Sequence, residues 1–159
     1  MKSSLIKTSD GSYTIYSKKY SQNFHNTKDG ALSESLNKHI IPSFAYHKNK
    51  KILNILDICF GLGYNSLATI YHIIKSDLDI SVNIYSPELD IELIRSLKDF
   101  IYPKEFDIFK DMITQLSQNL KYKDKRCSIT IYNQDAREYI NNCDIKFDIV
   151  YQDPFSSDV

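Results

Sequence analysis

The sequence lacks the features that mark secreted, membrane or metal-binding proteins. Its three cysteines, Cys59, Cys127 and Cys143, are widely spaced, so they form neither a paired disulfide framework nor a set of metal ligands. No apolar run reaches the roughly 18 residues that a transmembrane helix needs, and the polar residues 1–4 do not begin a signal peptide. We therefore predict a cytoplasmic protein with reduced thiols, no membrane segment and no metal.

An excess of charge of either sign is also absent. Twenty Lys and Arg residues balance twenty Asp and Glu residues, which gives a formal net charge of zero. A neutral chain exerts little long-range attraction on nucleic acid, so any contact with RNA must be local. The candidate contacts are the basic clusters at residues 18–19, 48–51 and 121–126, although solvated loops explain such runs more often.

The composition is that of one globular domain. The 159 residues are 42% hydrophobic and 25% charged, which is within the usual range for a soluble domain with a sizeable core. The pattern along the chain changes near residue 51. We therefore divide the sequence into an N-terminal hairpin and helix preface, residues 1–50, and a core, residues 51–159. The sequence sets no oligomeric state.

Local signals define the preface. The Asp-Gly pair at residues 10–11 joins the short runs 4–8 and 13–17, a pattern that favours a β-hairpin. A helix is predicted over residues 31–41, and we expect it to end before Pro42 because proline interrupts the helical hydrogen bonds.

The core alternates between strand and helix patterns. This alternation predicts an α/β fold, a Rossmann-like core with a parallel sheet and helices on both faces. The sequence ends soon after the fourth strand, where such a fold normally continues, so we expect a core truncated at that point. The expected elements are strands at 52–58, 80–85, 127–132 and 147–152, helices at 65–75, 91–100, 105–120 and 136–141, and a charged loop at 121–126.

A glycine turn follows the first core strand. Gly61 and Gly63 let the backbone turn sharply and approach a ligand, although a tight βα turn needs glycines for packing alone. A dinucleotide fingerprint would place a third glycine at position 66, which is Ser66. Asp57 would repel a pyrophosphate but attract the sulfonium of S-adenosylmethionine (SAM), so we predict SAM over NAD. Tyr64 is as consistent with packing as with cofactor contact.

Acidic residues follow each of the next three strands. Glu88 lies where doubly wound folds present a carboxylate to a ribose, or it caps a helix. Asp135 either reaches an adenine amino group or is the N-cap of the next helix. Asp153 could orient or deprotonate an attacking amine, and Phe155 could stack on a base, unless both belong to a simple turn. His25 is a lone histidine, for which a surface or packing role is the default.

Six motifs run in a fixed order along the chain: Asp10-Gly11-Ser12, Phe24-His25-Asn26, Gly30-Ala31 with Glu34 and Ser35, Phe60-Gly61-Leu62-Gly63-Tyr64-Asn65, Ser86-Pro87-Glu88 and Asp153-Pro154-Phe155-Ser156. In this order they resemble the MnmC-like methyltransferases. That family comprises the methyltransferase half of the bifunctional tRNA-modification enzyme MnmC and its stand-alone relatives. The resemblance covers nearly the whole chain.

The resemblance implies an enzyme that methylates 5-aminomethyl(-2-thio)uridine at the tRNA wobble position, with SAM as cofactor and tRNA as a transient partner. It implies that Asp153 is catalytic and faces the substrate amine, and that Phe155 and Ser156 bind the substrate. The implied cofactor-binding residues are Asp57, Phe60, Gly61, Gly63, Asn65, Glu88, Asp135 and Ala136.

This sequence departs from the family pattern at three positions. The family more often has Glu at Asp57, Thr at Leu62, and Gly or Ala at Pro154. Pro154 fixes φ and removes a backbone donor beside Asp153, so it bears on the substrate. Two other interpretations remain open: an aminopropyltransferase like the polyamine synthases, and a nucleotide-binding module without catalysis. A dehydrogenase is disfavoured by the missing third glycine.

Overall fold

The computed structural model describes residues 4–153 and 155, and it contains two sheets. A small antiparallel sheet is formed by β1 (Leu5–Lys7), β2 (Tyr13–Ser17) and β3 (Gln22–Asn23). The larger sheet has the strand order β6-β7-β5-β4-β8, and β7, β5, β4 and β8 are mutually parallel. Its strands are β4 (Ile52–Ile58), β5 (Ser81–Pro87), β6 (Lys121–Lys123), β7 (Cys127–Tyr132) and β8 (Ile149–Gln152).

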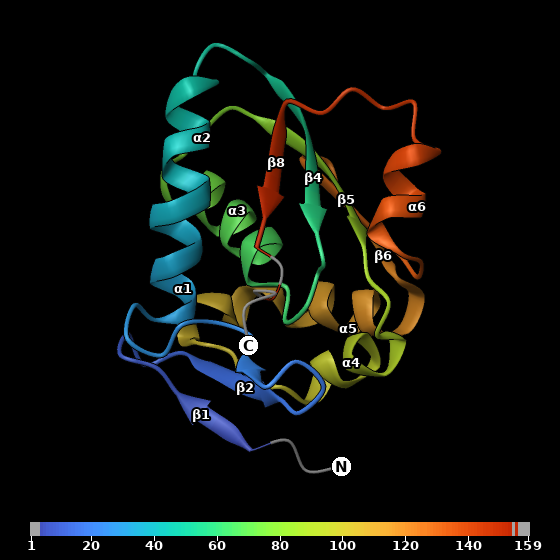
Figure 1. Cartoon of the computed structure of the whole chain (residues 1–159). Coiled ribbons are helices and arrows are strands. Elements are labelled where there is room, and N and C mark those ends of the chain that lie inside the picture. The colour runs from blue at the N-terminus through green and yellow to red at the C-terminus, as the bar shows by residue number, and fades with distance from the viewer. Residues whose placement is uncertain (1–3, 154, 156–159) are drawn as a thin grey trace.

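Helices connect the parallel strands. The predicted alternation is confirmed, and the chain has a Rossmann-like α/β core. Figure 1 shows α3 beside α1 and α2 at one side of the sheet and α6 at the other. The helices are α1 (Ala31–Glu34), α2 (Ile41–Tyr46), α3 (Tyr64–Lys75), α4 (Ile91–Ser96), α5 (Lys110–Asn119) and α6 (Ala136–Asn141).

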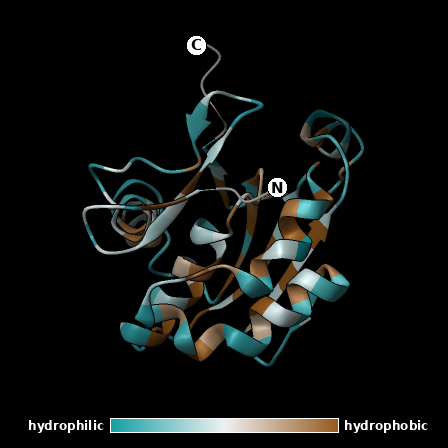
Figure 2. Cartoon of the chain, turned by 90° about the horizontal axis from the view of Figure 1, so that it is seen from below, coloured by the Kyte–Doolittle hydropathy of each residue, from teal (hydrophilic) through white to brown (hydrophobic). Residues whose placement is uncertain are grey.

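Apolar strand residues form the centre of the core. Parallel strands are covered on both faces, so they carry continuous apolar side chains, as β4 does here. In Figure 2 hydrophobic segments gather in the interior of the molecule, and hydrophilic segments are common on the helices and loops around them. In the described part of the chain, no helix is both long and apolar enough to span a membrane. Core side chains that are at most 1% exposed include Leu53, Ile55, Val82, Ile84 and Ile129.

The helix after residue 31 does not end before Pro42, and that prediction is wrong. A π-helical turn (Ser35–Ile40) joins α1 directly to α2, and Pro42 lies in the first turn of α2. The first turn of a helix is where a missing N–H is tolerated, because those donors have no helical acceptor. The wider π turn therefore lets the helical path continue through the proline.

Two further differences from the predicted elements concern short segments. The predicted loop 121–126 contains β6, which pairs antiparallel with β7 at the sheet edge. Its two lysines suit an exposed edge strand, and Asp124 closes the hairpin by accepting the N–H groups of Arg126 and Cys127. The predicted helix 105–120 begins as a 3₁₀ turn, Lys104–Phe109, before α5. The strand β3 was not predicted.

Tyr64 joins the preface to the core. Its ring is fully buried, and its hydroxyl donates a 2.7 Å hydrogen bond to the backbone oxygen of Tyr13 in β2. The same hydroxyl accepts the Tyr13 N–H at 3.3 Å. Burial raises the pKa of Tyr64 above its ordinary value, so the hydroxyl stays protonated. The structure shows the packing role of Tyr64, and because Tyr64 also lines the cleft, its contact with a cofactor stays a prediction.

Tyr64→Phe tests how strongly this contact holds the preface. We expect a loss of about 1–2 kcal/mol in the free energy of unfolding, because the Tyr13 carbonyl loses its buried donor. Urea denaturation of both proteins measures the difference. Tyr46→Phe is the matched control, since Tyr46 is 84% exposed and its variant should unfold like the wild type. Equal stability of all three proteins would show that the hydroxyl is dispensable.

Candidate functional site

A cleft of about 1010 Å³ lies at the carboxyl ends of the parallel strands. The arrows of β4 and β8 point toward the N-terminal strands, which line the other side of the cleft (Figure 1). Ligands bind at this edge in open α/β folds. The predicted site residues that line the cleft are Phe60, Gly61, Asn65, Glu88, Asp135, Ala136, Asp153 and Phe155. Their individual roles stay predictions, and Ser156 and Pro154 lie outside the described residues.

The glycine turn needs its glycines for conformation and for space. Gly61 and Gly63 have φ values of 56° and 76°, in the left-handed region that other residues rarely adopt. A Cβ added at Gly63 would lie 2.7 Å from Cε1 of Phe60, so the turn is closed around that ring. Cys59, directly before the turn, also has a positive φ of 65°, and such strain concentrates at functional sites.

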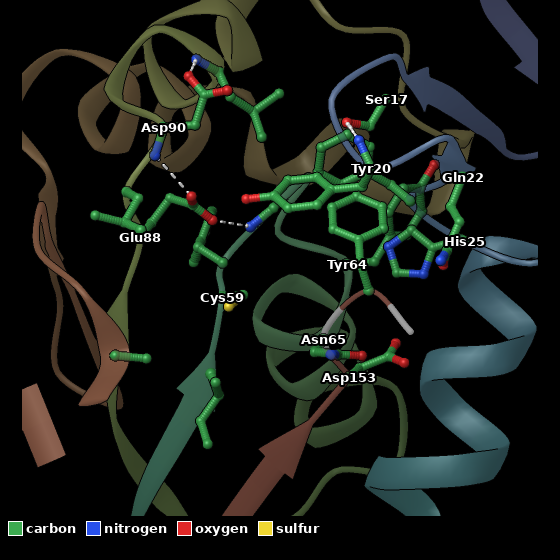
Figure 3. A pocket seen from close by; sticks show the side chains of 18 of the residues that line it. Ser17, Tyr20, Gln22, His25, Cys59, Tyr64, Asn65, Glu88, Asp90 and Asp153 are labelled. Carbon is green, nitrogen blue, oxygen red and sulfur yellow. Dashed lines mark hydrogen bonds between the residues drawn. The ribbon is translucent and has the colours of Figure 1, made fainter. Parts of the chain in front are cut away.

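Glu88 fastens the glycine turn to the end of β5. The Gly61 N–H donates to its Oε2 at 2.9 Å, and the Asp90 N–H donates to its Oε1 at 2.8 Å (Figure 3). These two bonds fix the carboxylate at the cleft while each oxygen retains acceptor capacity. Burial and the nearby Glu88 carboxylate raise the pKa of the Cys59 thiol to about 11, so that thiol is neutral. The arrangement suits the recognition of hydroxyl donors such as those of a ribose.

Asp135 is the N-cap of α6, one of the two roles predicted for it. Its Oδ1 accepts the Arg137 N–H at 2.8 Å, and its Oδ2 accepts from the Arg137 guanidinium at 2.9 Å. These bonds lower the pKa of Asp135 to about 2 and keep it anionic. Because Asp135 also lines the cleft, capping does not remove it from ligand contact.

Asp57 is buried beneath the glycine turn. It is 1% exposed; Ser66 donates a 2.6 Å hydrogen bond to its Oδ2, whereas Oδ1 has no partner among the described residues. Burial raises the pKa of Asp57 to about 7, against the lowering effects of Ser66 and Asn65. The buried Oδ1 atom of Asn65 is also without a partner in the described part of the chain. Asn65 lines the cleft, so its acceptor fits a ligand that brings cationic or N–H donors, whereas Asp57 lies behind the lining and can act on such a ligand through its charge.

The buried His25 and the carboxylates of Glu34 and Asp153 lie close together at the side of the cleft that the preface lines. His25 Nδ1 lies 3.5 Å from Glu34 Oε2, which is longer than a normal hydrogen bond. The contact with His25, the Lys38 ammonium at 2.6 Å and the Asn26 N–H at 3.1 Å lower the pKa of Glu34 to about 2. Of the two default roles for His25 the structure shows packing, because its ring is buried and meets Tyr64 edge-on at 4.9 Å, and His25 also lines the cleft.

His25, Glu34 and Asp153 each place one polar atom within 4.8 Å of the others (Figure 3 shows His25 and Asp153). These are metal-ligating residue types, but the Lys38 ammonium already pairs with Glu34 Oε1, which occupies one of the two carboxylates. The arrangement presents negative charge to the cleft, which favours an amine. That no metal binds stays a prediction.

An aromatic wall completes the cleft. The ring of Phe155 stacks on Tyr20, with centroids 4.4 Å apart and planes 18° apart, and it meets Phe24 edge-on at 4.8 Å. Tyr20 projects into the middle of the view in Figure 3. The preface therefore supplies two of the three rings, and a flat aromatic surface of this kind can stack a nucleobase.

No family model matches the chain. A crystal structure of MnmC2 from Aquifex aeolicus superimposes on 97% of the chain with a TM-score of 0.81 and 32% sequence identity. The predicted resemblance to the MnmC-like family is confirmed. An uncharacterized protein from Methanocaldococcus jannaschii is 33% identical over 157 residues, 96% of the chain. The chain spans 50% of the MnmC2 chain and 41% of the M. jannaschii protein.

Among the residues that the sequence analysis did not single out as site residues, Glu34 and Tyr20 line the cleft, and His39 lies beside Asp153 without lining it. Glu34 belongs to a motif that the resemblance included, but its position in the sequence does not show that its helix faces the cleft. Tyr20 is on a loop without a recognisable pattern. The position of His39 could not be predicted from the sequence because it depends on the π turn, which places His39 Nε2 3.8 Å from Asp153 Oδ2.

Proposed function

We propose that the chain is the cofactor- and substrate-binding core of a SAM-dependent N-methyltransferase that acts on 5-aminomethyl(-2-thio)uridine at the wobble position of cytoplasmic tRNA. The observation that carries the proposal is the convergence at the cleft of Glu88, Asp135 and Asp153, each following a different parallel strand, beside an aromatic wall and with Asp57 buried behind the glycine turn. The likeness to MnmC2 supports the same class of enzyme.

The proposed division of the cleft follows from the chemistry of its walls. Glu88 accepts ribose hydroxyls, Asp135 accepts the adenine amino group, and the unpartnered Oδ1 of Asn65 receives the charged methionine part, which the buried Asp57 attracts through its charge. When bound, SAM supplies a methyl group on a sulfonium, and the amine nitrogen bonds to that carbon as the carbon–sulfur bond breaks and its electron pair stays on sulfur. The turn at Gly61 and Gly63 allows the close backbone approach that this cofactor needs.

Asp153 acts on the amine. An alkylammonium cannot attack because its nitrogen has no free electron pair, so one proton must leave first. In the proposed step an Asp153 oxygen accepts this proton, and the amine is held in line for the displacement. The rings of Tyr20, Phe24 and Phe155 hold the pyrimidine by stacking.

Methyl transfer to tRNA that carries the unmethylated aminomethyl base tests the proposal. We expect SAM to give the methylaminomethyl nucleoside, identified by mass spectrometry of digested tRNA, and decarboxylated SAM to give no product. Aminopropyl product with the decarboxylated form would instead show an aminopropyltransferase. Tight SAM binding without transfer to any such tRNA would show a binding module without catalysis.

The affinity for SAM should depend on pH through Asp57. Below a pKa of about 7 this carboxyl is neutral in the free protein, and above it the carboxylate attracts the cationic cofactor. We expect binding to tighten by up to about tenfold between pH 6 and pH 8, measured by calorimetry. Asp57→Asn should bind weakly with a flatter profile. A steep profile that persists in this variant would assign the effect to another group.

A further inference from the structure

His39 is a half-buried histidine that points at the proposed catalytic carboxylate. It lies on the π-helical turn Ser35–Ile40, and its side chain is 18% exposed. The Nε2 atom is fully covered, lies 3.8 Å from Asp153 Oδ2 and makes no hydrogen bond within the described residues. A buried ring nitrogen without a partner is uncommon, and those that occur call for an explanation. A small movement of Asp153 would supply the missing acceptor.

The groups around Asp153 leave His39 as its partner. Glu34 is already held by the Lys38 ammonium and the Asn26 N–H, and His25 Nδ1, which also makes no hydrogen bond among the described residues, lies 3.5 Å from that same carboxylate. No hydrogen bond to the side chain of Asp153 is present in the described part of the chain. Asp57 is buried nearby and interacts electrostatically with both groups. The charge of His39 lowers the pKa of Asp57, and the charge of Asp153 raises it. The three side chains therefore form one electrostatic cluster.

The π turn is the feature that brings His39 to this place. A π turn inserts one residue into a helix and is frequent at functional sites. Here it precedes Pro42, and the His39 carbonyl accepts a 2.6 Å hydrogen bond from Ser43 Oγ, which fixes the backbone on the other side of the proline. The imidazole also packs at 5.8 Å from the ring of Tyr151, whose hydroxyl is paired with Thr69 at 2.9 Å. His39 is thus held from several sides.

We propose that His39 is the positioning residue of Asp153. Its Nε2–H donates to one carboxylate oxygen and turns the other toward the substrate nitrogen. This role rests on the proposed function, in which the ammonium N–H bond breaks and the proton passes to that free oxygen of Asp153. The aspartate lies at the end of β8, next to the surface, so without this bond its carboxylate has no fixed direction.

A pair of substitutions separates positioning from structure. His39→Phe removes the donor, whereas His39→Gln retains an N–H at a similar distance from the backbone. We expect His39→Phe to lower kcat about tenfold or more with little change in KM or SAM affinity, and His39→Gln to recover most of the loss. The control is His72→Phe, because His72 is half-buried in α3 with its ring edge-on to Phe44 and does not line the cleft. That variant should turn over like the wild type.

A second readout does not need activity and works in the unaltered His39 chain. The ring ¹⁵N resonances of His39 should shift when Asp153 is changed to Asn, while those of His72 stay in place. Unmoved His39 resonances, or a His39→Gln variant as slow as His39→Phe, would overturn the proposal. If the wild type transfers no methyl group but the His39 resonances shift, the proposed function fails and the pairing of His39 with Asp153 holds.

Discussion

Asp153→Asn is expected to bind SAM like the wild type and to lower kcat for methyl transfer about 10²–10⁴-fold, the usual worth of a positioned general base. The amide retains the shape of the carboxylate but cannot accept a proton from the alkylammonium. Because Asp153 is in contact range of His39 and His25 rather than part of the hydrophobic core, the variant should fold normally. Single-turnover rates with saturating SAM and tRNA measure the effect.

The control for this variant is Asp79→Asn, which also replaces one carboxylate by an amide. Asp79 pairs with Lys51 on the surface, and its side chain is 88% exposed. It should retain wild-type turnover. A wild-type rate in Asp153→Asn would remove the aspartate from the reaction and leave desolvation and alignment as the remaining functions of the cleft.

Gly63→Ala is expected to lower both SAM affinity and stability. The new Cβ would lie 2.7 and 2.9 Å from two carbons of the Phe60 ring, and alanine at φ 76° is itself strained by about 1–2 kcal/mol. The turn must therefore shift, and with it the N-terminus of α3 and the neighbouring Gly61. We expect at least a tenfold loss in SAM affinity by calorimetry, with reduced resistance to urea.

Gly11→Ala isolates the contribution of backbone strain. Gly11 has a φ of 82°, but an added Cβ there has nothing within 4 Å, and the residue lies in the hairpin turn away from the cleft lining. It should lose stability and retain SAM affinity. If both variants bound SAM equally well, the shape of the glycine turn would not matter for the cofactor.

The core of the fold could be predicted because each of its signals is local. The apolar run Ile52–Ile58, the glycines at 61 and 63, and the helix that follows them are contiguous in sequence, and their patterns agree with one another. The same reasoning located the acidic residues at the strand ends. Parallel strands must bring those ends to one edge, so the cleft followed from the strand assignments.

The incorrect secondary-structure predictions concern segments in which tertiary packing outweighs the local sequence preference. Pro42 normally ends a helix, but the π turn before it removed the conflict. The segment containing β6 is short and charged, and it becomes a strand only because β7 offers a free edge. His39 and Tyr20 lie in segments without a catalytic pattern. The place of Tyr20 in the cleft and that of His39 beside Asp153 depend on how the preface packs against α3, which no single window of sequence encodes.

The central claim is that the cleft binds SAM, and calorimetric titration of the wild-type chain with SAM and with NAD tests it most directly. The account predicts saturable binding of SAM at one site per chain, weakened in Gly63→Ala, and no measurable heat with NAD. Binding of NAD in preference to SAM, or of neither, would contradict it.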